Sequence, residues 1–162
     1  MTDYTNNYFR TMNDIGKGYE AARAQRRLEK DRLMEANDWE GVKRWNEREE
    51  KEFPYPFSRG QMSAFRAWQN TNTHKSSVDE ESVLEVNDLP WDRDAHDFIQ
   101  TIKQAGIRYF AITDRSTSLM EMLHVFKDEE GCKLIGLCKV DRIEERWGGI
   151  EVDACNGILM ET

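Results

Sequence analysis

The stretch from Ala95 to Thr113, AHDFIQTIKQAGIRYFAIT, predicts a helix, its end and a strand in direct succession. The apolar residues of its first half recur at the three- and four-residue spacing of one helix face: Ala95, Phe98, Ile99, Ile102 and Ala105. Gly106 follows at the position where a left-handed residue commonly ends a helix. Residues 107–113 are rich in aromatic and β-branched side chains and predict a strand.

The residues on either side continue this alternation. We expect a strand at 83–86, a turn at 87–92, a helix at 119–129 ending at Gly131, and strands at 132–140 and 149–160. The order β-α-β-α-β-β favours a small sheet with right-handed crossovers in its first two connections. The last two strands are expected to pair as an antiparallel hairpin, with its turn at Trp147-Gly-Gly149.

The N-terminal part of the chain predicts helices. Good helix formers fill residues 18–36, and further helices are expected at 39–52 and 59–70. Two pairs have the spacing of a capping box, Asn37 with Glu40 and Ser58 with Gln61.

A polar run at residues 70–77 predicts a linker after these helices. The expected fold class is therefore α+β. A helical arm of two to three helices, residues 1–78 with the linker, would pack on a small α/β domain formed by residues 79–162.

The segment Ile112-Thr-Asp-Arg-Ser-Thr-Ser-Leu-Met-Glu121 follows a predicted strand, a common place for a ligand. A phosphate loop needs glycines and a lysine, and residues 113–118 contain neither. Ser118 and Glu121 instead have the spacing of a capping box. Asp114 is the one residue there that is left as a candidate for a chemical role, and a single carboxylate specifies no reaction.

The histidines and cysteines lack the close spacing of a metal site. They are His74, His96, His124, Cys132, Cys138 and Cys155. Three cysteines in predicted strands suit reduced core thiols better than a disulfide framework. We expect no metal, no cofactor and no catalytic residue.

The net charge of −8 is concentrated in the C-terminal part of the chain. Residues 1–52 carry −1, residues 53–78 carry +3 and residues 79–162 carry −10. Such a surface repels nucleic acid and attracts basic partners, or it is simply solvated. The candidate partner-binding residues are its densest carboxylates: Asp128, Glu129, Glu130, Asp141, Glu144 and Glu145.

A basic stripe on the first long helix is the alternative site, for nucleic acid. Arg23, Arg26, Arg27 and Lys30 recur at helical spacing and could contact several phosphates. Interleaved acidic residues could use much of this charge in ion pairs within a solvated helix face. Because the chain has neither a long apolar run nor a signal-type segment, we expect a cytoplasmic protein.

Three segments resemble small uncharacterised proteins carried by phages and conjugative elements of gut Firmicutes. They are Trp91–Ile107, Ile112–Glu121 and Gly131–Val140, within a likeness that spans roughly residues 80–160. The resemblance implies an accessory protein of a mobile genetic element. Anti-CRISPR inhibitors recur among small acidic proteins of such elements.

The leading hypothesis is a non-enzymatic anti-CRISPR inhibitor whose acidic face occludes the nucleic-acid channel of a CRISPR effector nuclease. Its rival is a nucleic-acid-binding accessory protein that uses the basic stripe. A small enzyme acting through Asp114 is a third reading. A homo-oligomer is compatible with each of them.

Overall fold

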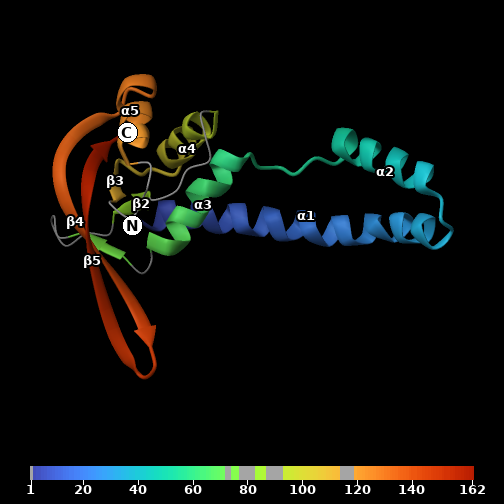
Figure 1. Ribbon diagram of the computed structural model, residues 1–162, viewed down its shortest axis with the longest axis horizontal. Helices are drawn as coiled ribbons and strands as arrows, with labels where there is room; N and C mark the ends of the chain where they lie inside the picture. The colour runs from blue at the N-terminus through green and yellow to red at the C-terminus, as the bar shows by residue number, and fades with distance from the viewer. Residues whose placement is uncertain (1, 72–73, 77–82, 87–92, 114–118) are drawn as a thin grey trace. The chain divides into compact units, whose positions relative to one another are not determined.

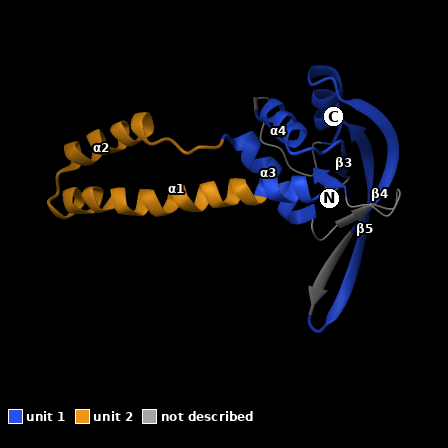
Figure 2. Cartoon of the chain, turned by 180° about the vertical axis from the view of Figure 1, so that it is seen from behind, with its two compact units in different colours: residues 1–9, 58–162 blue, residues 10–57 orange. Residues whose placement is uncertain are grey.

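A computed structural model describes residues 2–71, 74–76, 83–86, 93–113 and 119–162, with the backbone alone at 74–76, 93 and 142–146. It contains two compact units, one of residues 1–9 and 58–162 and the other of residues 10–57 (Figure 2). The domain boundary near residue 79 stays a prediction. The expected turn at 87–92, Asp114 and Ser118 lie outside the described residues.

The first unit holds one mixed sheet in the order β1-β4-β5-β3-β2 (Figure 1). Its strands are β1 (His74–Ser76), β2 (Leu84–Val86), β3 (Tyr109–Thr113), β4 (Lys133–Arg146) and β5 (Gly149–Glu161). β2 and β3 are parallel, and the other pairs are antiparallel. The helices are α1 (Asp3–Glu35), α2 (Trp39–Glu52), α3 (Arg59–Thr71), α4 (Arg93–Gln104) and α5 (Leu119–His124), followed by the π-helical turn η1 (Val125–Glu129). The predicted α+β class is confirmed.

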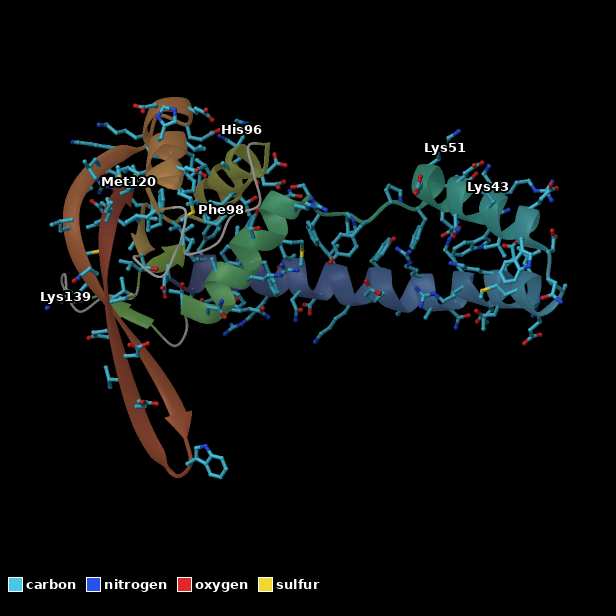
Figure 3. The ribbon with its side chains drawn as sticks, viewed as in Figure 1. Lys43, Lys51, His96, Phe98, Met120 and Lys139 are labelled. Carbon is cyan, nitrogen blue, oxygen red and sulfur yellow. The ribbon has the colours of Figure 1, made fainter. Side chains whose placement is uncertain are left out.

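A cluster of three phenylalanine rings joins α4 and η1 to the sheet. Phe98 lies on α4 (Figure 3). It is buried together with Phe110 of β3 and Phe126 of η1, and the Phe110 and Phe126 ring centroids lie 5.0 Å apart in an edge arrangement. Side chains alternate along a strand, so the neighbours of Phe110 lie on the opposite face. That face carries a second buried cluster of Ala111, Cys138, Val140, Cys155 and Leu159.

Several local predictions are confirmed by hydrogen bonds. Gly106 has a φ of 78°, and the amides of Gly106 and Ile107 donate to Lys103 and Ile102, which ends the helix before β3. The Ser58 and Gln61 side chains accept each other's backbone amides at 3.3 and 2.7 Å, forming the predicted capping box of α3.

The first helix begins much earlier than expected, at Asp3 and not near residue 18. Asn, Thr and Gly give residues 3–17 a weak helix propensity, but tertiary contacts override it. The Thr5 hydroxyl donates to the Ala105 carbonyl at 2.7 Å, and the Phe9 ring stacks on Trp68 of α3 with centroids 5.2 Å apart.

The capping box expected from Asn37 and Glu40 is wrong. Asn37 has a φ of 53°, and the amides of Asn37 and Asp38 donate to Met34 and Leu33, so Asn37 ends α1. Asp38 starts α2 by accepting the Gly41 amide at 3.0 Å.

Three further boundaries differ from expectation. The predicted linker at 70–77 contains the end of α3 and also β1, whose polar residues form a short strand by pairing with β4. β4 continues to Arg146, beyond the apolar run 132–140, because pairing with β5 extends the ladder through charged residues. The helix expected at 119–129 changes to a π-helical turn at Val125.

Candidate protein-docking surface on the β4–β5 hairpin

The last two strands form a hairpin that extends beyond the rest of its sheet. β3 pairs with β5 over residues 157–161, and β1 pairs with β4 up to Arg142, opposite Asp153. Of the strands that the structure describes, none flanks residues 143–152, the segment we call the distal hairpin (Figure 1). An isolated two-stranded ribbon is marginally stable in water because it buries little apolar surface.

The distal hairpin nevertheless carries large apolar side chains. Trp147 in the turn is wholly exposed at 105%, and Ile150 and Val152 of β5 are 72% and 60% exposed. Trp147 and Gly148 both have positive φ values, 46° and 83°, as a tight two-residue hairpin turn requires. Tryptophan is enriched at the energetic centres of protein interfaces, and exposed apolar patches mark such sites.

Acidic and apolar side chains lie on opposite faces of this part of β5. Glu151 and Asp153 are exposed and alternate with Ile150, Val152 and Ala154, so carboxylates and apolar side chains occupy opposite faces of the strand. The predicted partner-binding residues Glu144 and Glu145 lie on β4 in register with Glu151 and Ile150. Their side chains are not described.

The other predicted carboxylates form a separate group near η1. Asp128 lies 2.7 Å from Nδ1 of His124, Glu129 is exposed, and Glu130 lies 3.0 Å from Nδ1 of His96 on α4. Asp141, which is half-buried, stands eight residues past the start of β4 at Lys133, roughly 26 Å along the strand. The six predicted residues therefore fall into two groups, one before the start of β4 and one in its second half.

The alternative basic site lies in the second unit, where α1 and α2 form a helical hairpin. Arg26 donates through Nε and Nη2 to the carboxylate of Glu49, with Nε 2.8 Å from Oε2, and its guanidinium lies 4.7 Å from the Phe53 ring centroid. Glu49 is buried. These hydrogen bonds hold the pKa of Glu49 below its ordinary value and raise that of Arg26.

The other cations of the stripe differ in their contacts and exposure. Lys30 lies 5.3 Å from the Trp45 ring centroid, and Arg23 donates to the Tyr19 hydroxyl at 3.1 Å. Arg27 is exposed. Three of the four predicted cations thus contribute to packing within the helical hairpin.

A buried polar network lies on the sheet face that carries the thiols. The Thr113 hydroxyl donates to Glu85 Oε1 at 2.8 Å, and the Glu85 amide donates to the Thr71 hydroxyl at 3.3 Å. All three residues are buried. The network joins β2, β3 and α3, which is a structural role.

All three cysteines are buried, and none of them forms a disulfide. Burial raises the thiol pKa of both Cys132 and Cys138, and the neighbouring Cys155 raises that of Cys138 further. Protonated thiols are weak nucleophiles and weak metal ligands. Among the described residues, no three His, Cys, Asp or Glu side chains are grouped to hold a metal ion.

The candidate docking surface was missed in the sequence. Its signal was present, because apolar and acidic residues alternate from Ile150 to Ala154 directly after an aromatic turn residue. That pattern predicts a half-buried strand, and only the sheet topology shows that no third strand among the described residues pairs with it.

A family model matches most of the first unit. No helix within the described segments has the length and apolar character needed to span a membrane. Neither a search of curated proteins nor a search of solved structures found a match. A family model described as Domain of unknown function (DUF7698) matches residues 63–162, from α3 through the whole sheet. Because this match spans more than half of its 162 residues, the chain belongs to the DUF7698 family.

Proposed function

We propose that this protein is a non-enzymatic binding protein that docks on a partner protein through the distal hairpin. The observation that carries the proposal is the exposure of Trp147, Ile150 and Val152 on a ribbon that no other described strand flanks. Covering these side chains would remove apolar surface from water and stabilise a ribbon that is marginal alone. A rigid tryptophan at the tip suits insertion into a pocket of the partner.

The net charge of the C-terminal part of the chain favours a basic partner. Residues 79–162 carry −10, and Glu151 and Asp153 stand beside the apolar side chains. An acidic and apolar ribbon complements a groove with basic walls, as in proteins that hold nucleic acid.

Within that class, we propose a CRISPR effector nuclease as the partner. The protein would act in the cytoplasm as an anti-CRISPR inhibitor from a mobile genetic element. The distal hairpin would occupy the basic channel that otherwise holds nucleic acid, and Asp128, Glu129 and Glu130 would supply a second acidic contact.

A DNA-cleavage assay tests this proposal. A purified, guide-loaded CRISPR effector nuclease is mixed with excess protein, and cleavage of a labelled target is followed. We expect inhibition, weakened about tenfold or more by Trp147→Ala, because a central tryptophan contributes strongly to binding. Trp39→Ala is the matched control, since Trp39 is also exposed but lies on α2. Undiminished cleavage, together with no effector recovered on immobilised protein, would refute the anti-CRISPR proposal.

A further inference from the structure

We propose that Trp147 is a docking anchor that weakens the turn of its own hairpin, and that it fills an apolar pocket of the partner protein containing one hydrogen-bond acceptor. This inference rests on the proposed function and specifies what the partner offers at that site. Three properties of Trp147 support it: its backbone conformation, its exposure and its indole N–H.

The turn that carries Trp147 is of type I′. Arg146 and Gly149 form the closing pair of the β4–β5 ladder, so Trp147 and Gly148 are the two turn residues. Both have positive φ values, 46° and 83°, the combination that a type I′ turn requires. Asparagine, aspartate and glycine favour these positions, because the left-handed region strains the backbone of larger residues. Gly148 suits its position, whereas the bulky Trp147 does not.

Packing within the chain does not offset this strain. The Trp147 side chain is wholly exposed, so it buries no apolar surface against other residues. The turn ends a two-stranded ribbon, which is marginally stable by itself. Asparagine at position 147 would suit the turn better and would leave less apolar surface in water. Folding alone gives no reason for a tryptophan here, and an unfavourable backbone conformation at an exposed site points to binding.

The indole N–H defines the chemistry of the pocket. Buried tryptophans usually donate this N–H to an acceptor, as Trp68 does to Asn6 Oδ1 at 3.0 Å. Docking would remove the N–H of Trp147 from water, and a buried donor without an acceptor is unfavourable. The pocket must therefore combine apolar walls around two fused rings with one carbonyl or side-chain oxygen that accepts the N–H.

The surroundings of the turn favour a protein pocket over nucleic acid bases. Aromatic side chains also stack on bases, usually within a positively charged groove. Ile150 and Val152 near the turn are 72% and 60% exposed, and residues 79–162 carry a net charge of −10. Exposed apolar neighbours suit a protein interface, and a net negative charge repels phosphates.

Trp147→Asn in the full chain tests whether the tryptophan weakens the hairpin. Every second residue of an antiparallel strand bonds across the ladder, so hydrogen exchange at the amides of Glu151 and Asp153 reports hairpin stability. We expect Trp147→Asn to slow this exchange about fivefold by relieving left-handed strain. Trp147→Ala, which retains a residue unsuited to the turn, should not slow it. Unchanged or faster exchange in Trp147→Asn would overturn the inference.

Binding is measured to a guide-loaded CRISPR effector nuclease, the proposed partner. We expect Trp147→Asn to weaken binding about tenfold or more, although its hairpin is more stable. Trp147→3-benzothienylalanine keeps the size and shape of the indole and replaces its N–H with sulfur. This variant should leave hydrogen exchange unchanged and weaken binding about fivefold, because the acceptor in the pocket loses its donor. Equal binding of the benzothienyl variant would overturn the predicted pocket.

The outcomes separate this inference from the proposed function. If Trp147→Asn leaves the exchange rates unchanged while effector binding still depends on Trp147, the inference fails and the proposed function stands. If the effector does not bind the unsubstituted chain, both fail. If a labelled oligonucleotide binds the chain and loses affinity with Trp147→Ala, the ring stacks on nucleic acid and the protein pocket is overturned.

Discussion

The guanidinium of Arg26 and the carboxylate of Glu49 form a bidentate ion pair that ties α1 to α2. Pairing lowers the pKa of Glu49 below its ordinary 4.5. The stabilisation is therefore complete above pH 4.5 and is lost as the pH falls through the lowered pKa. Glu49→Gln should lower the thermal midpoint at pH 7 by on the order of a few degrees, and by less at pH 3, because the stabilisation declines below pH 4.5.

Circular dichroism melts at the two pH values measure this effect. Glu50→Gln is the matched control, because Glu50 is the exposed neighbour of Glu49 on the same helix. An equal loss for both variants, or an undiminished loss for Glu49→Gln at pH 3, would show that the pair does not hold the two helices.

Replacing glycine by alanine should have opposite effects on stability at two positions. A Cβ at Gly60 would collide with the backbone carbonyl of Asp94, so Gly60→Ala should separate α3 from α4 and destabilise by about 1–3 kcal/mol. A Cβ at Gly18 would meet nothing within 4 Å, so Gly18→Ala inside α1 should stabilise by about 0.5–1 kcal/mol. Urea unfolding of both variants checks the signs, and a stabilising Gly60→Ala would mean that the two helices pack differently.

The buried thiols should be unreactive in the folded protein. Because burial raises the pKa of Cys132 and Cys138, iodoacetamide at pH 8 should alkylate them far more slowly than it alkylates free cysteine. Their contribution to stability is complete below the ordinary thiol pKa of 9.0 and declines as the pH rises from there through the raised value. Mass spectrometry of timed reactions measures the labelling rate. Rapid labelling of these thiols would contradict the prediction.

The basic stripe should bind nucleic acid weakly or not at all in the intact protein. Arg26 pairs with Glu49, and Lys30 lies over the Trp45 ring, which leaves Arg27 as the exposed member. Labelled DNA or RNA mixed with the protein alone should show no shift at physiological salt. A shift that weakens steeply with salt, and that is lost in Arg27→Glu, would favour the nucleic-acid-binding alternative.

Local sequence signals predicted much of the sheet region. The periodic residues from Ala95 to Ala105 and the stop at Gly106 located α4 and the start of β3 because both depend on neighbours in the chain. The start of α1 and the strand β1 were missed because they depend on partners far away, Ala105 and Val140 respectively.

The candidate docking surface was likewise predictable only in part from local sequence. The turn at Trp147 and the strand after it were predictable from local pattern, whereas the exposure of their side chains is known only from the structure. Charge alone selected residues before the start of β4 and in its second half and could not tell one group from the other.

Site-specific photo-crosslinking tests most directly whether the distal hairpin is the protein-docking element. Benzoylphenylalanine replaces Trp147 in one variant and Trp39 in another, and cross-linked products from cells that naturally carry the gene are identified by mass spectrometry. The predicted result is a nucleic-acid-binding protein cross-linked from position 147, absent from position 39 and lost when Ile150→Asp is added. Identical products from both positions, or none from position 147, would contradict docking through the distal hairpin.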